Sequence, residues 1–491
     1  MHGHNRLRST IANILPVGSD KNHLLNKPAT ASLIYTATNV FARAAALVFT
    51  PFFTRILSRT EYGNYALFHT YVALISAIGT LEIGGGILLR VLGKHRSSPR
   101  AALRCAAVLS LFSVSLTFLA FLAYRRMSGG GAIFRGDALL IFASVAFPSM
   151  INLFTAYCRF FYRWRASVVI TAVLSVLSPL ASLFILLSPY RAGSNAAAVK
   201  IAVGTIVLAI VGTPIIIYML KGKNDEPKLP LKVGISELLR LAIPMLPYYL
   251  SVMIINESDK LIIERYLGGE ELAKYSVAYS AGVAASVIST GASQILCAWA
   301  ARKCAEGKFN KINEVILGGV KILSALIIAF LCAAPELFSL LAPPEYSTAL
   351  FSVYPVAIAI IPIFLISLIT TISLGSNRTL PSLISGVSAA VLHGQLAHYL
   401  IPRYGIGAAG IVHLISYVIL LLILALSYRF IDKEKLINVN QTFQIIILSS
   451  MLSFVTYQLK SLLLMRILIA IAAVSYAAIR LYKERYLICE R

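Results

Sequence analysis

The chain consists of long apolar blocks separated by short polar segments. The blocks are about 17 to 28 residues long, which is the length that a helix needs to cross a ~30 Å hydrocarbon core. Inside lipid, backbone groups must be satisfied within their own segment, so such blocks are expected to be helices. The alternating pattern of a membrane-spanning barrel is absent. The pattern therefore predicts an all-α, polytopic membrane protein.

About fourteen transmembrane helices are predicted. Their approximate ranges are 28–53, 64–92, 101–124, 136–160, 167–188, 197–220, 237–263, 274–301, 312–334, 347–374, 380–401, 407–429, 442–460 and 463–482. The polar segment 1–27 is interpreted as a cytoplasmic tail. The block after it is interpreted as a first spanning helix and not a cleaved signal peptide, because it is long and leads directly into further spans.

The largest polar interruption, 221–236, is interpreted as a cytoplasmic linker. It separates an N-terminal six-helix lobe, 28–220, from a C-terminal six-helix lobe, 237–430, and two additional helices with a tail follow in 431–491. Two short stretches, Arg55–Tyr65 and Arg265–Tyr275, share four of eleven residues, and each follows the first helix of a lobe. This repeat predicts two similar lobes around a central cavity that holds the substrate.

The distribution of charge predicts the orientation of the chain. Charged residues make up 13% of the sequence, against about 25% in soluble domains. The net charge is +24, and 28 of the 44 Lys and Arg residues lie in segments on the side of the N-terminus. Because basic loops stay in the cytoplasm, both termini are predicted to be cytoplasmic in a bacterial inner membrane. Topology thus explains the basic balance, and a nucleic-acid partner is not expected.

Enzymatic chemistry has no clear signature in the sequence. The six cysteines show no paired metal spacing, so no metal site is predicted. There is no phosphate-binding glycine loop of the nucleotide-binding type, no Asp-x-Asp motif and no long extracytoplasmic loop. We therefore expect neither ATP hydrolysis nor glycosyl transfer, and no cofactor.

Four stretches resemble the oligosaccharide flippases of polysaccharide biosynthesis, which include O-antigen flippases and belong to the multidrug/oligosaccharidyl-lipid/polysaccharide exporter superfamily. They are Thr54–Tyr65, Leu81–Arg90, the pair Ser258–Gly268 and Glu271–Tyr279, and Pro344–Tyr346. The chain departs from the family pattern at Lys260, Ala273 and Pro343, where the family usually has arginine, glycine and glycine. Six residues of these stretches are family-motif candidates with a structural role: Arg55, Glu61, Asp259, Lys260, Arg265 and Glu271.

The resemblance implies an activity and a set of partners. The implied substrate is an undecaprenyl-diphosphate-linked oligosaccharide, which would move from the inner to the outer leaflet. Partners would be this polyprenyl-linked glycan, membrane lipids, and the polysaccharide polymerase and chain-length machinery.

Charged groups within the spans are the candidates for substrate contact, because each costs about 2.5–3.5 kcal/mol to insert. Arg43 is the first choice, since a guanidinium binds phosphate bidentately, and Asn39 lies four residues earlier on the same helical face. The full set of cavity candidates is Arg43, Asn39, Glu82, Arg90, Asn152 and Lys321. Alternatives remain: Arg43 could pair with a carboxylate for stability, and Arg90 could extend to the headgroups.

A few residues are candidates for coupling transport to an ion gradient. Glu82, His393 and His398 are the candidates for binding H⁺ or Na⁺, although a histidine in a helix bundle is more often a hydrogen-bonded core residue. The main alternative function is a cation-coupled multidrug antiporter of the same superfamily. Fourteen spans and a cation in the first span favour the flippase over this antiporter. The embedded charges also argue against a scaffold without transport activity.

Overall fold

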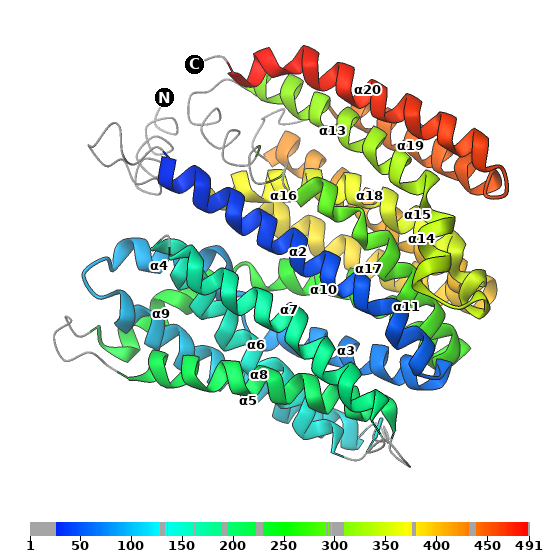
Figure 1. Cartoon of the computed structure of the whole chain (residues 1–491). Helices are drawn as coiled ribbons and strands as arrows, with labels where there is room; N and C mark the ends of the chain where they lie inside the picture. Colours follow the sequence, from blue (N-terminus) through cyan, green and yellow to red (C-terminus); the bar gives the residue numbers. More distant parts are fainter. Residues whose placement is uncertain are drawn as a thin grey trace. The chain divides into compact units, whose positions relative to one another are not determined.

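The computed structural model describes residues 26–127, 133–134, 136–161, 163–188, 195–221, 229–290, 293, 296, 309–375, 380–431 and 438–489. Every regular element in these ranges is a helix, which confirms the predicted all-α class (Figure 1). The predicted cytoplasmic tail lies outside these ranges, except for its last two residues, which begin the first helix. Contacts between residues divide the chain into two units, Val17–Glu257 and one that contains Ser258–Arg491.

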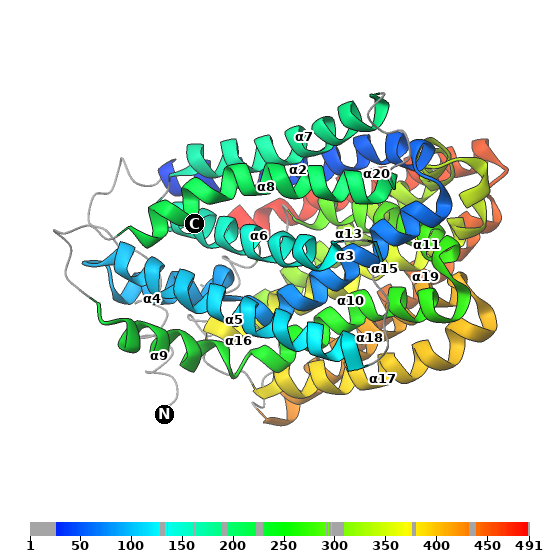
Figure 2. The same ribbon diagram turned by 90° about the horizontal axis from the view of Figure 1, so that it is seen from below.

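The first unit is a bundle of antiparallel helices. Its elements are α2 (Asn26–Ile56), α3 (Arg59–Gly79), the π-helix η1 (Ile83–Ile87), α4 (Leu88–Lys94), α5 (Pro99–Met127), α6 (Asp137–Phe160), α7 (Trp164–Leu187), α8 (Ala196–Leu220) and α9 (Leu231–Ala242). Helix α7 packs between α2 and α8, and α6 packs on α8, α5 and α3 (Figure 2). Helix α10 (Leu246–Leu267) then passes from the first unit into the second.

The second unit contains the remaining helices. They are α11 (Gly269–Ala284), α13 (Phe309–Cys332), α14 (Ala334–Leu341), the 3₁₀ helix η3 (Pro344–Ala349), α15 (Leu350–Ile358), α16 (Ile360–Gly375), α17 (Leu380–Tyr404), α18 (Ile406–Ile431), α19 (Val439–Gln458) and α20 (Leu463–Cys489). Helix α17 packs along α18, and α13 packs against both C-terminal helices, α19 and α20 (Figure 1).

The described helices are long and apolar enough to span a membrane many times. Ten qualify by length and hydropathy, or twelve when two bent helix pairs each count as one span. Helices α2 and α11 are not among these ten or twelve, since α2 carries several polar side chains and α11 has only 16 residues. A count of fourteen spans stays a prediction, and much of the end of the predicted 274–301 span lies outside the described residues.

Two predicted continuous spans are bent in the structure. The predicted 237–263 span is made of α9 and α10, which meet at 57° beside Pro244, a residue without an N–H to continue the helix. The predicted 64–92 span is broken between α3 and α4, which meet at 48°. Leu81 and Glu82 have φ values of 51° and 50° there. The glycine run Gly84–Gly86 follows this break directly, within η1.

Side-chain packing and ion pairs hold the bent segments in place. The core beside α4 is built from Leu88, Leu92, Leu103, Met150 and Leu238, all fully buried. The amphipathic helix α9 is also tied to the end of α4, because Glu237 accepts hydrogen bonds from Lys94 and His95. As a result, residues 231–236 of the predicted linker form an ordered part of α9.

In the second unit, an ion pair joins α14 to α20. The Arg466 guanidinium donates to Glu336 Oε2 at 2.6 Å and also bonds Oε1. A third hydrogen bond from Arg466 reaches the carbonyl oxygen of Cys332 at 2.6 Å. This arginine therefore fixes the C-terminal helix to the helix end that precedes α14.

Candidate functional site

The first helix carries a polar stripe in an otherwise apolar segment. Asn39 and Arg43 lie near the middle of α2, four residues apart, and both side chains are exposed. Their separation places them on one face of the helix, as predicted. One turn earlier, Tyr35 continues this face. The exposure of a guanidinium at this depth shows that Arg43 does not lie in the packed interior of the first unit.

Helix α6 has a similar polar face. Asn152 and Arg159 are both exposed and lie seven residues apart, which is close to two turns. The Tyr35 hydroxyl group of α2 interacts electrostatically with Arg159. Arg159 was not singled out from the sequence, where it counted only as one of several cytoplasmic basic residues. The two helices thus bring two arginines and two amides to the accessible surface of one unit.

The break between α3 and α4 lies beside this polar surface. A Cβ atom on Gly84 would lie 2.9 Å from Asn152 Nδ2, so η1 approaches α6 closely at that point. Glu82, half-buried, immediately precedes η1, and Arg90, also half-buried, follows about two turns later. Tyr249 of α10 interacts electrostatically with both of them. The break therefore brings the backbone of η1 close to the amide of α6.

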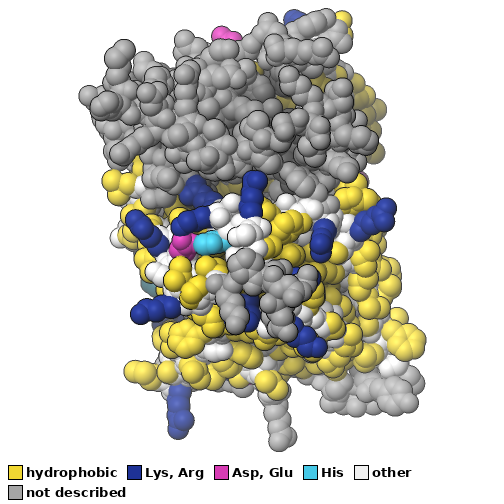
Figure 3. All heavy atoms as spheres, turned by 90° about the vertical axis from the view of Figure 1, so that its left-hand side faces the viewer, with side chains coloured by type: hydrophobic (Ala, Val, Ile, Leu, Met, Phe, Trp, Pro, Cys, Tyr) yellow, Lys and Arg dark blue, Asp and Glu magenta, His cyan; other side chains and the backbone are white. Residues whose placement is uncertain are grey.

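One end of the first unit is strongly basic. Figure 3 shows a face on which Lys and Arg side chains gather among hydrophobic ones, with few acidic side chains in view. Ten described basic residues belong to the ends of α4 to α9 that lie on the predicted cytoplasmic side: Lys94, Arg96, Arg100, Arg104, Arg159, Arg163, Arg165, Lys221, Lys232 and Arg240. In these segments Glu237 is the one described acid. Such an end attracts anionic headgroups.

The motif residues at the opposite helix ends have structural contacts. Glu61 forms a capping box with Ser58 at the start of α3 and also accepts a hydrogen bond from the Ala196 N–H at 2.9 Å. Arg55 donates to the Pro51 carbonyl at the end of α2. Lys200 of α8 was not singled out from the sequence, and its Nζ lies 3.6 Å and 3.5 Å from the ring centroids of two aromatic residues, Phe53 and Tyr65.

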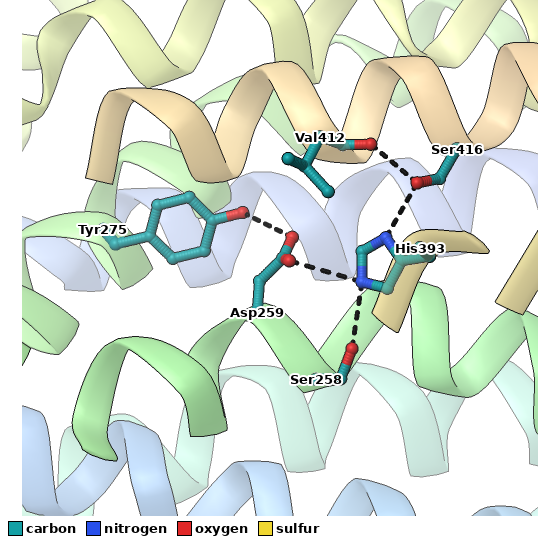
Figure 4. A network of polar contacts seen from close by, with 6 residues as sticks. All are labelled: Ser258, Asp259, Tyr275, His393, Val412 and Ser416. Atoms are coloured by element: carbon teal, nitrogen blue, oxygen red, sulfur yellow. Dashed lines mark hydrogen bonds and ion pairs between the residues drawn. The ribbon is translucent and has the colours of Figure 1, made fainter. Parts of the chain in front are cut away.

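The second unit holds a buried network of polar side chains (Figure 4). His393 of α17 is 0% exposed and Asp259 of α10 is 1% exposed. His393 Nε2 lies 3.3 Å from Asp259 Oδ1 and 2.9 Å from Ser258 Oγ, and Nδ1 lies 2.8 Å from Ser416 Oγ of α18. Tyr275 of α11 donates to Asp259 Oδ2 at 3.4 Å.

This network changes the interpretation of two predicted residues. Asp259 was a family-motif candidate with a structural role; it lies inside α10, which continues to Leu267, and its carboxylate faces a histidine inside the bundle. His393 was a candidate for ion coupling, and the structure places it beside that acid. The sequence offered no signal for the pairing, since the two residues are 134 positions apart.

The remaining candidates of the second unit differ in their surroundings. Lys260 Nζ lies 4.7 Å from the Tyr279 ring centroid, and Glu271 pairs with Lys274 at 2.5 Å. Lys321 is half-buried in α13, and Arg265 is exposed.

His398 is exposed, with Nε2 3.3 Å from the Tyr266 hydroxyl. It lines a cavity of about 820 Å³ between α10 and α17. The two histidines that were predicted as one coupling set thus lie in different environments.

Comparison with known proteins gives a consistent picture. The polysaccharide biosynthesis protein family matches residues 30–296, and no curated protein matches the chain.

Among solved structures, the lipid II flippase MurJ in its inward closed conformation has a TM-score of 0.62 at 14% identity, covering 93% of this chain and all of MurJ. A MATE protein in complex with MaL6 has a TM-score of 0.55 at 12% identity, covering 88% and 100%. An outward-facing MATE multidrug transporter of the MOP superfamily also has a TM-score of 0.55, at 14% identity, covering 88% and 98%.

Proposed function

Because this chain belongs to the polysaccharide biosynthesis protein family and has the fold of the MOP superfamily, we propose that it is a flippase. Its substrate is an undecaprenyl-diphosphate-linked oligosaccharide, which it moves from the inner to the outer leaflet of a bacterial cytoplasmic membrane. The moved glycan then serves surface polysaccharide synthesis. The chain acts as a transporter and not as an enzyme, and its termini are cytoplasmic.

The exposed Arg43 in the middle of α2 is the observation that carries this proposal. A diphosphate that crosses the membrane loses water and counterions. A guanidinium offers charge and a planar pair of donors in their place. Asn39 on the same face and Asn152 on α6 add amide groups that can bond sugar hydroxyls. An arginine kept exposed at this depth costs insertion free energy that a purely structural role does not require.

The basic ends of α4 to α9 support the proposed direction. A lipid-linked diphosphate starts in the cytoplasmic leaflet, and a basic surface there raises its local concentration. The same asymmetry supports cytoplasmic termini under the positive-inside rule. The polysaccharide polymerase and chain-length machinery are proposed partners, because they use the glycan on the opposite side.

The test is complementation of a bacterium that lacks its flippase and makes a suitable lipid-linked glycan. We expect the intact chain to restore precursor in the outer leaflet. Arg43→Ala should lower the amount of outer-leaflet precursor at least tenfold. Arg43→Lys retains part of the activity, since it keeps the charge and loses the fork. Arg403→Ala, an exposed arginine stacked on Tyr399 in the second unit, is the control. Membrane levels of each variant are measured by immunoblot.

Two outcomes contradict the proposal. If Arg43→Ala matches the parent at equal membrane level, the role of Arg43 is wrong. If the intact chain moves no precursor and instead protects cells from toxic cations, the multidrug antiporter replaces the flippase.

A further inference from the structure

We propose that Asp259 and His393 form a proton-binding site inside the second unit. The two side chains and Ser416 come from three helices, α10, α17 and α18 (Figure 4). Each of these three side chains is at most 1% exposed. His393 lies near the middle of α17, and so at membrane depth. A buried acid beside a buried histidine at this depth is costly to maintain, which makes a functional role the natural hypothesis.

The hydrogen bonds determine where the proton binds. Ser416 Oγ lies 2.7 Å from the Val412 carbonyl oxygen, which can only accept, so the serine hydrogen points there. Ser416 Oγ must then accept from His393 Nδ1, 2.8 Å away. Nδ1 therefore carries a hydrogen in both charge states of the ring. The second ring nitrogen, Nε2, is the atom that gains or loses a proton.

The other side of the ring has one hydrogen too few. In neutral His393, Nε2 accepts from Ser258 Oγ at 2.9 Å. Asp259 Oδ1 is then a buried oxygen without a hydrogen-bond donor among the described residues. When Nε2 is protonated, it faces Asp259 Oδ1 at 3.3 Å as an ion pair, and Ser258 can turn its hydroxyl away. One added proton thus satisfies the unpartnered oxygen and neutralises the buried carboxylate.

The other polar and titratable groups around the site make different contacts, so proton binding is assigned to His393 and Asp259. On α11, Tyr275 donates to Asp259 Oδ2. Next to it, Tyr279 lies against Lys260, with 4.7 Å between Nζ and the ring centroid. On α18, His413 is 1% exposed, and its ring lies 5.3 Å from that of Tyr279. On α17, His398 is exposed and contacts Tyr266 instead.

A proton at this position acts on the helix that joins the two units. The boundary between the units falls between Glu257 and Ser258, one residue before Asp259. Proton binding creates an ion pair from α10 to α17, and proton loss breaks it. We infer that a proton gradient drives or gates transport through this link. This consequence for transport rests on the proposed function, whereas proton binding itself does not.

The direct test follows protonation in the full-length protein, reconstituted in lipid with ¹⁵N-labelled histidine, by NMR between about pH 5 and 9. We expect one buried histidine signal to titrate, to disappear in His393→Gln and to remain in His398→Gln. Asp259→Asn, which keeps the shape of the acid, removes the counter-charge. We expect it to lower proton affinity at least tenfold, a shift of about one pH unit.

Three results overturn the proposal: a His393 signal that does not titrate in this range, an Asp259→Asn variant with unchanged affinity, or displacement of the proton by Na⁺ at constant pH. The last would assign the site to an alkali cation. A transport assay in vesicles with an imposed pH difference provides the second readout, and there the stimulation should vanish in Asp259→Asn. If no variant transports the glycan, the proposed function fails, and the titration still decides the proton site.

Discussion

The ion pair between α5 and α6 offers a quantitative test of the packing in the first unit. Arg125 donates to both carboxylate oxygens of Asp137, at 3.1 Å and 2.7 Å. Asp137 also accepts from the Ile133 N–H at 2.8 Å. The two side chains are 14% and 4% exposed. Asp137→Asn keeps the backbone hydrogen bond and leaves the guanidinium without its counter-charge.

The expected loss follows from these contacts. Removing one partner of a buried pair costs about 3–5 kcal/mol. Here about 2–3 kcal/mol is expected, because asparagine still accepts from Ile133 and Arg125 lies at a helix end, where it can extend toward water. For a domain of 150–250 residues, each kcal/mol shifts Tm by about 2–4 °C. Asp137→Asn should therefore lower Tm by roughly 4–12 °C.

The shift is measured by heating the detergent-purified protein and monitoring its unfolding by size-exclusion chromatography. The double variant Arg125→Met with Asp137→Asn should recover part of the loss, because no unpaired charge stays buried. Arg126→Met is the matched control, since Arg126 is the exposed neighbour. A shift below 1 °C for Asp137→Asn, or an equal loss for the control, would refute the reasoning.

Three further predictions follow from close approaches and charge. Gly84→Ala should displace the flexible Asn152 amide and reduce glycan transport with little change in Tm, checked by the complementation assay. Gly282→Ala should cost about 1–3 kcal/mol, because its Cβ would lie 2.8 Å from a packed side chain and 3.0 Å from a carbonyl oxygen. Gly394→Ala meets nothing within 4 Å and should not lower Tm in the same unfolding assay. Glu336 accepts hydrogen bonds from the arginine of α20, and these lower its pKa below the ordinary value of 4.5. The stabilisation of the fold by this ion pair is therefore complete above about pH 4.5 and is lost as pH falls through the lowered pKa. Glu336→Gln should lower Tm at pH 7, and the difference from the parent should shrink on acidification.

Local sequence determined the class of the protein and most of its helices. Apolar blocks of membrane length leave the backbone no alternative to helix, because lipid offers it no hydrogen-bond partners. The polar stripe on α2 was equally readable, since residues four apart share a face. At Gly84–Gly86 the local sequence permits unwinding without requiring it, because without a Cβ atom the backbone can leave the helical region.

Tertiary structure decided which side chains meet. No sequence pattern pairs Asp259 with His393 or distinguishes His393 from His398, because contact across three helices depends on how each helix is rotated about its axis. The bends at Pro244 and at Leu81–Glu82 likewise depend on packing, since many prolines and glycines occur in straight membrane helices. Helical periodicity is a local property of the chain, whereas burial and charge pairing arise only when distant segments pack together.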